Sequence, residues 1–255
     1  MALKRVDVTI LLSLTGADWG LSDLERTVDS IRRQEIVDWR LSVVDATCNL
    51  DAHALVKRMV PAAKLLWETP VLARAETMQA CLWQAAGGMK SLWAAYIDAG
   101  CAWSKDHLLR LLSVGRSYEL DFVFSGAQSP ATEFWGRIPE ALHRENIIDL
   151  ASVLHTQGIY RAAVAGWRRE QTTCADWDLW LQMAEAGAKF GHVAVPTVER
   201  RRSMMPVVDK REAQSLRSRF SVKPIPEFTL EDLKILAEEE NESSEERLYL
   251  TQGNR

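Results

Sequence analysis

Apolar runs alternate with segments of helical periodicity along most of this chain. Continuous apolar runs rich in β-branched residues are typical of strands covered on both faces of a sheet, and apolar residues that recur every three or four positions are typical of helices packed on it. The predicted strands are 6–14, 41–44, 64–67, 92–97, 122–124 and 193–195, and the predicted helices are 22–34, 51–59, 73–86, 104–112 and 176–186. Strands that alternate with helices pair in parallel, so the pattern predicts an α/β fold with a mostly parallel, Rossmann-like central sheet flanked by helices.

The pattern changes after Pro206. A helix is predicted at 212–220, two prolines punctuate the segment that follows, and Thr229 opens an acidic helix. We therefore predict one domain over residues 1–205 and a C-terminal helical extension over 206–255. The extension is expected to present a solvated acidic face, or alternatively to dock a protein partner.

Charge and cysteine usage restrict the class of protein. The net charge is −4, and residues 227–255 account for −6 of it, with nine acidic against three basic residues. Residues 1–226 therefore carry +2, and this near-neutral body argues against a general nucleic-acid binder. The four cysteines are scattered without a C-x-x-C pair, which favours reduced thiols in the cytoplasm. No apolar stretch is long enough to span a bilayer, so we expect a cytoplasmic protein, or one bound peripherally to the inner face of a membrane.

Three aspartates occupy positions where a binding crevice is expected. Asp45 follows the second predicted strand, Asp98 follows the strand at 92–97, and Asp176 opens the segment D-W-D-L-W-L. In doubly wound sheets, ligands bind beyond the carboxyl ends of the strands. Each aspartate taken singly is equally consistent with a helix cap or a loop. Together they predict a crevice lined by carboxylates.

Three motifs in register resemble the inverting family-2 glycosyltransferases of the GT-A fold. The motifs are S-I-R-R-Q at 30–34 at the end of the first helix, Y-I-D-A-G-C-A-W at 96–103 around the family's D-x-D segment, and D-W-D-L-W-L at 176–181. The resemblance covers roughly residues 5–203. It implies a GT-A fold for this part of the chain, and the predicted helical extension follows it as a C-terminal appendage.

The resemblance also implies an activity and its residues. A sugar would pass from a nucleotide-sugar donor, expected to be UDP-linked, to a saccharide, lipid-linked or protein acceptor with inversion, as in polysaccharide biosynthesis. Asp45 would contact the base, Asp98 the ribose or a metal ion, and Asp176 would act as general base on the acceptor hydroxyl. Further candidates for donor binding are Thr15 in the first loop, Trp103 and Trp177 as stacking platforms, and Arg74, Arg200 and Arg202 as partners of the diphosphate.

The chain departs from the family's pattern at several of these positions. Gly100 replaces the second D-x-D carboxylate, Ala46 follows Asp45, and Ala175 precedes the expected base. Hard divalent cations need several oxygen ligands, so a site for Mn²⁺ or Mg²⁺ built on Asp98 is only weakly supported. We expect weak or metal-independent activity. The alternatives are a catalytically impaired scaffold or glycan-binding module, and a sugar-activating nucleotidyltransferase, whose glycine-rich loop residues 14–17 match poorly.

Overall fold

The structure of the chain is a computed structural model. It describes residues 8–14, 19–35, 38–45, 47, 49–70, 91–129, 132–135, 142, 146, 148–163, 165–168, 173–200, 210–219 and 226–235. Within these ranges no helix combines the length and the apolar character that crossing a membrane requires. The predicted helix at 73–86 lies outside the described residues.

Ten described strands form one sheet. They are β1 (Val8–Leu14), β2 (Trp39–Asp45), β3 (Leu65–Pro70), β4 (Trp93–Asp98), β5 (Cys101–Trp103), β6 (Phe122–Ser129), β7 (Thr132–Trp135), β8 (Val153–Thr156), β9 (Phe190–Arg200) and β10 (Glu227–Phe228). The strand order is β10-β9-β6-β8-β4-β1-β2-β3, with β5 paired to β9 and β7 paired to β6. The α/β class is confirmed.

Most of the sheet is parallel, but its centre is not. β1 pairs in parallel with β2 and with β4, and β6 pairs in parallel with β9. β8 lies between β4 and β6 and is antiparallel to both. The sheet is therefore mixed. The alternation pattern did not predict β8, because four residues that include a histidine and a threonine do not stand out as a strand.

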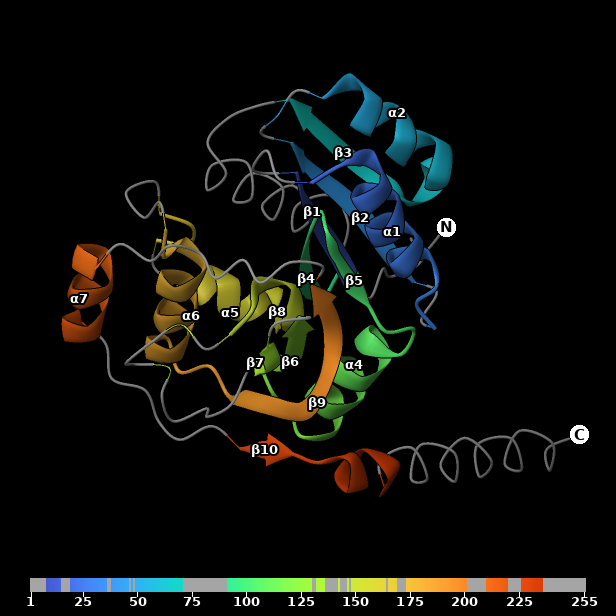
Figure 1. Cartoon of the computed structure of the whole chain (residues 1–255). Coiled ribbons are helices and arrows are strands. Elements are labelled where there is room, and N and C mark those ends of the chain that lie inside the picture. Colours follow the sequence, from blue (N-terminus) through green and yellow to red (C-terminus); the bar gives the residue numbers. More distant parts are fainter. Residues whose placement is uncertain are drawn as a thin grey trace, which may run out of the picture.

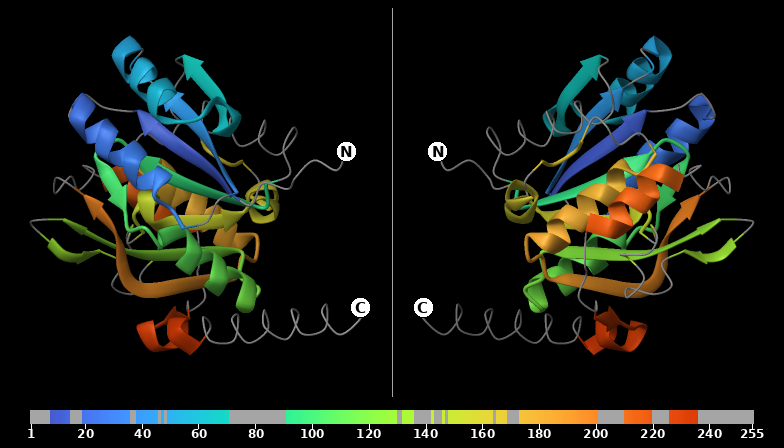
Figure 2. Two further views of the ribbon diagram at one scale, coloured as in Figure 1. Left: turned by 90° about the vertical axis from the view of Figure 1, so that its right-hand side faces the viewer. Right: turned by 90° about the vertical axis from the view of Figure 1, so that its left-hand side faces the viewer.

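Helices cover both faces of the sheet (Figures 1 and 2). The described helices are α1 (Leu21–Arg32), α2 (Leu50–Met59), α4 (His107–Ser117), α5 (Gln157–Ala162), α6 (Ala175–Glu185) and α7 (Lys210–Arg219), with short 3₁₀ turns η1 (Ala62–Lys64) and η3 (Leu150–Ser152). Residues 230–235, which follow Thr229, are also helical. One core lies under α1, α2 and α4, and a second lies under α5, α6 and α7. Because side chains alternate along a strand, β1 contributes Leu12 to the first core and Leu11 to the second.

Both described parts of the C-terminal extension pack against the domain. Ala213 and Leu216 of α7 are buried in the second core, and Phe228 of β10 is buried in the first. A Cβ on Gly191 would lie 2.9 Å from the Phe228 ring, so the strand edge there needs a glycine to admit the aromatic side chain. The boundary between residues 205 and 206 stays a prediction.

One helix start differs from its prediction. Ser104 was expected to cap α4, but the N-cap is Asp106, and the helix begins at His107 and continues to Ser117. Ser104 lies before the helix and supports its N-cap. Its hydroxyl donates to Asp106 Oδ1 at 2.7 Å, and its carbonyl accepts from His107 N at 3.1 Å. Asp106 in turn forms an ion pair with Arg110 one turn further along the helix. The polar residues before the helix therefore form a small network that fixes its first turn.

Two buried histidines should make the fold sensitive to acid. Burial lowers the pKa of His107 from 6.5 to about 3 and that of His155 from 6.5 to about 4. Below pH 6.5 the unfolded chain therefore binds more protons than the folded chain, and the free energy of unfolding decreases as the pH is lowered. At pH 5 each histidine should reduce the free energy of unfolding by about 2 kcal/mol relative to pH 7.

Urea denaturation at pH 7 and at pH 5 measures this effect. A His155→Gln variant should lose about 2 kcal/mol of the difference between the two pH values, because the contribution of His155 is gone. Equal free energies of unfolding at the two pH values would contradict the prediction.

Candidate functional site

The parallel strands place two of the predicted aspartates at one edge of the sheet. Asp45 is in register with Leu14, and Asp98 is in register with Ser13, so the two aspartates flank the end of β1. Two interstrand spacings separate them, or roughly 10 Å between their Cα atoms. By alternation their side chains start toward opposite faces, Asp45 toward α2 and Asp98 toward the face covered by α6.

Asp176 lies at the first turn of α6, which is directed toward the same edge. A short turn joins the end of α6 to the start of β9, and Trp180 of α6 packs on Phe122 at the start of β6. A helix that leads into a parallel strand in this way runs antiparallel to it. The start of α6 therefore points toward the carboxyl ends of the strands, as its course in Figure 1 illustrates.

The carboxylate of Asp45 is fully buried and its oxygens are engaged. Oδ1 accepts from the backbone N of Thr47 at 2.6 Å and from Thr47 Oγ1 at 2.7 Å, and Oδ2 is 2.7 Å from His53 Nε2 on α2. Burial by itself would raise the pKa of Asp45, but the hydrogen bonds from Thr47 and His53 outweigh it and hold the pKa below its usual value. In this structure Asp45 closes the turn after β2 and ties α2 to the sheet.

Asp98 ends β4 and is partly exposed. Two turn residues, Ala99 and Gly100, lead from it into β5, and Gly100 has a φ of 96°, a conformation that favours glycine. The backbone N of Ala99 donates to the carbonyl of Ser13 at 3.0 Å, which ties this turn to β1. The D-A-G segment is thus a tight turn whose only carboxylate is Asp98.

A buried ion pair lies beside this turn. Arg200, the last residue of β9, pairs with Cys101 in the sheet, and its guanidinium forms an ion pair with Asp149. Asp149 also caps η3 by accepting from Ala151 N at 2.8 Å. Burial alone would lower the pKa of Arg200, but Asp149, assisted by Asp98, raises it above its ordinary value, so the side chain stays charged. For the neighbouring thiol of Cys101, burial has the opposite effect and raises the pKa to about 12, so the thiol stays protonated.

Within the D-W-D-L-W-L segment, Asp176 is partly exposed and the five residues after it are buried. Asp176 Oδ1 accepts from Trp177 N at 2.9 Å, and Oδ2 accepts from Asn146 Nδ2 at 3.2 Å. Asp178, in contrast, has no exposed surface, accepts from Gln182 Nε2 at 2.7 Å and lies 3.5 Å from Arg168 Nε. Most of this motif therefore serves packing, and its first aspartate is the member that reaches the surface.

The two predicted stacking tryptophans belong to the core. Trp103 is 5% exposed, stacks on His107 with ring centroids 4.6 Å apart, and donates to the carbonyl of Ala151 at 2.7 Å. Trp177 is 1% exposed and donates to the carbonyl of Leu142 at 2.7 Å. Neither ring offers a face to a sugar in this conformation, because the indoles fill the interior instead. We leave both out of the proposed site.

Three other candidates, Thr15, Arg74 and Arg202, lie outside the described residues. Among the residues that the structure does describe, no three His, Cys, Asp or Glu side chains come together in a way that could hold a metal ion. Asp98 has no second carboxylate across its turn, because position 100 is glycine, and Asp149 is engaged by Arg200. The described residues therefore do not fit a divalent cation site.

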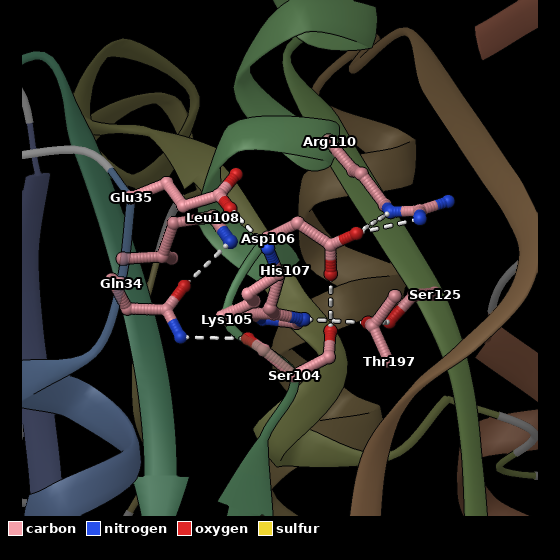
Figure 3. Close-up of polar contacts among 10 residues, drawn as sticks. All are labelled: Gln34, Glu35, Ser104, Lys105, Asp106, His107, Leu108, Arg110, Ser125 and Thr197. Carbon is pink, nitrogen blue, oxygen red and sulfur yellow. Dashed lines mark hydrogen bonds and ion pairs between the residues drawn. The ribbon is translucent and has the colours of Figure 1, made fainter. Parts of the chain in front are cut away.

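The glutamine of the S-I-R-R-Q segment has a clear structural role (Figure 3). Gln34 Oε1 accepts from Leu108 N at 3.0 Å, and Nε2 donates to the carbonyls of Ser104 at 2.8 Å and Ser30 at 3.1 Å. It joins the end of α1 to the start of α4. Sequence reasoning identified the motif without predicting this contact, and it missed Asp149 altogether.

Comparison with known proteins establishes the fold. No protein-family model matches this chain, and no curated protein matches it in sequence. Among solved structures, S. aureus TarS matches with a TM-score of 0.61 and 10% identity over 82% of this chain and 42% of the TarS chain. A shorter TarS chain in complex with UDP matches with a TM-score of 0.58 and 10% identity over 84% of this chain and 70% of its own.

A third match is the mannosyltransferase PcManGT from Pyrobaculum calidifontis in complex with GDP-Man and Mn²⁺. It has a TM-score of 0.58 and 16% identity over 83% of this chain and 60% of its own. The present chain thus spans 42% of the first TarS chain and 60% of PcManGT, less than two thirds of each. At these identities the likeness shows the fold, which is the GT-A-like fold of glycosyltransferases.

The two aspartates of the α6 motif should differ sharply in their effect on stability. Asp178→Asn removes a buried charge that pairs with Arg168 and should lower the free energy of unfolding by about 2–3 kcal/mol. Asp176→Asn alters a partly exposed side chain and should change it by less than about 1 kcal/mol. Urea denaturation followed by circular dichroism measures both. Equal losses would show that Asp176 is as structural as Asp178.

Proposed function

We propose that this protein is an inverting glycosyltransferase that moves a sugar from a nucleotide-sugar donor, UDP-linked, to a hydroxyl of a saccharide or lipid-linked acceptor. The observation that carries the proposal is the position of Asp98 and Asp176. Both are partly exposed, and both lie toward the carboxyl edge of a GT-A-like sheet. In open α/β sheets this edge is the usual place for a nucleotide. The neighbours solved with UDP and with GDP-Man support the same class of donor.

Asp176 is the proposed general base. It lies in the first turn of α6, where the helix dipole stabilises negative charge. Its two hydrogen bonds, from Trp177 N and Asn146 Nδ2, fix the carboxylate while its surface remains partly accessible. The acceptor hydroxyl would lose its proton to Asp176 as its oxygen attacks the anomeric carbon and the nucleoside diphosphate leaves from the opposite side. Such a base contributes about 10²–10⁴-fold to the rate.

On the donor side we propose that Asp98 binds the ribose and that Asp45 lies near the base. Asp45 could reach a base only after giving up a contact to Thr47 or His53, so its contribution to affinity should be the smaller of the two. Arg200 keeps its charge beside the turn, but Asp149 already neutralises much of it. The assignments of Thr15, Arg74 and Arg202 to the phosphates stay predictions.

The neighbour solved with Mn²⁺ makes a divalent cation a reasonable cofactor for this fold. At the turn after β4 the described residues supply a single carboxylate, Asp98, where a divalent cation needs several oxygen ligands. We therefore propose that donor binding depends little on metal. Positive charge for the departing diphosphate would come from arginine side chains.

The first test is UDP binding by isothermal titration, with Mn²⁺ and with EDTA. We expect the dissociation constants in the two conditions to agree within about threefold, because the protein offers few ligands to a metal. Asp98→Asn should weaken binding about tenfold, as expected for the loss of a charge-assisted hydrogen bond. Binding that requires Mn²⁺ would contradict the proposed metal independence.

The second test is turnover of a panel of nucleotide-sugars by the parent chain and by Asp176→Asn. Transfer or hydrolysis should fall at least about 100-fold in the variant, because the base is lost, with UDP affinity unchanged. Glu185→Gln, at the exposed far end of the same helix, is the matched control and should retain full activity. Unchanged turnover in Asp176→Asn would remove Asp176 from its proposed role.

A non-catalytic scaffold or glycan-binding module is the second candidate function. Two specific features favour it, namely the engagement of both Asp45 oxygens within the fold and the glycine at position 100. This candidate predicts no UDP binding at millimolar concentration. Binding of oligosaccharides without UDP affinity would favour it over the enzyme. Docking of a protein partner by the acidic extension stays a prediction under either function.

A further inference from the structure

The hydroxyl of Thr27, in the middle of α1, contacts two consecutive residues, Gly100 and Cys101, at the end of the turn that follows Asp98. Thr27 Oγ1 accepts from the backbone N of Gly100 at 3.0 Å and donates to the carbonyl of Cys101 at 2.7 Å. Thr27 and Cys101 are buried, so water cannot readily replace the hydroxyl. The same oxygen also lies 3.0 Å from the carbonyl of Asp23 one helical turn earlier, the usual contact of a threonine inside a helix.

The turn is therefore held from two elements. On one side Ala99 N bonds to the carbonyl of Ser13 on β1 at 3.0 Å, and on the other side Gly100 and Cys101 bond to Thr27. Asp98 is the residue directly before these contacts. The backbone position from which its side chain projects is consequently fixed by β1 and α1 together.

The helix that presents Thr27 is itself anchored on either side of it. Gln34 joins its end to α4 (Figure 3), and Arg26, adjacent to Thr27, forms an ion pair of 2.6 Å with Glu199 of β9. Ser30 Oγ also donates to the carbonyl of Thr27 at 2.7 Å. Thr27 thus belongs to a helix that contacts both α4 and β9, and its hydroxyl connects the turn to that helix.

From these contacts we infer that Thr27 is a positioning residue for donor binding, which acts by holding the turn after Asp98 in place. This inference rests on the proposed function, in which Asp98 contacts the donor. Glycine at position 100 has no side chain with which to hold the end of the turn. The hydroxyl of Thr27 takes over that task from outside the turn.

The test compares matched threonine variants. Thr27→Val keeps the shape of the side chain and leaves Gly100 N and the Cys101 carbonyl without their partner. Thr27→Ser retains the hydroxyl. The control is Thr9→Val in β1, which also removes a fully buried threonine hydroxyl, one that donates to Ser91 Oγ at 2.8 Å. Thr27→Ala serves as a second loss variant if Thr27→Val does not fold.

UDP affinity by isothermal titration and unfolding temperature are measured for each variant. We expect Thr27→Val to bind UDP about tenfold more weakly, with Thr27→Ser and Thr9→Val within about twofold of the parent. The unfolding temperatures of Thr27→Val and Thr9→Val should fall by similar amounts, because each loses one buried hydroxyl. Equal loss of UDP affinity in those two variants would show a general effect of destabilisation and would overturn the inference.

A double-variant cycle then separates positioning from indirect effects. If Thr27 acts through Asp98, adding Thr27→Val to Asp98→Asn should weaken UDP binding by no more than about twofold beyond Asp98→Asn alone. Fully additive losses would overturn the inference. If the parent and Thr27→Val bind UDP equally well, the inference about Thr27 is overturned and the proposed function stands. Parent protein that does not bind UDP at all would overturn the proposed function and the inference together.

Discussion

The parallel pairing of β1 with β2 on one side and with β4 on the other is the interaction on which the rest of the molecule depends. Parallel pairing requires the chain to return to the same end of the sheet before each new strand, as it does through α1 between β1 and β2. It also brings the carboxyl ends of the strands to one edge, so that Asp45 and Asp98 flank the end of β1. The direction of α6 follows from the same rule, because it leads into β9.

Polar residues in this fold divide into two groups with different tasks. One group is buried and paired within the structure, as Asp45 is with Thr47 and His53, Asp178 with Gln182 and Arg168, and Asp149 with Arg200. A buried charge is stable only with such partners, so these residues have little capacity left for a ligand. The other group, Asp98 and Asp176, keeps accessible surface near the strand ends. The proposed chemistry relies on this second group.

The same division applies to the segments that resemble glycosyltransferase motifs. Gln34 links α1 to α4, and the tryptophans at 177 and 180 fill the second core, so these positions are constrained by packing whatever the molecule does. Position 100 is constrained by its backbone instead, since its φ of 96° favours glycine and its bond to Thr27 needs no side chain. A GT-A-like fold alone does not determine an activity, and here the residues with accessible surface have to be judged one by one.

The sequence alone predicted the α/β class, the strands that became β1, β2, β3, β4, β6 and β9, and the position of Asp45 and Asp98 at the ends of their strands. Apolar runs and their ends are local features, so the sequence by itself reveals them. The tertiary structure decided what local patterns do not contain. The short strand β8 forms because β4 and β6 lie on either side of it, and Trp103 and Trp177 turn inward because their indole N–H groups find carbonyl partners there. Thr27 and Asp149 carry no signal in the sequence, since the partners that give them a role are 73 and 51 positions away and meet them only when the sheet is assembled.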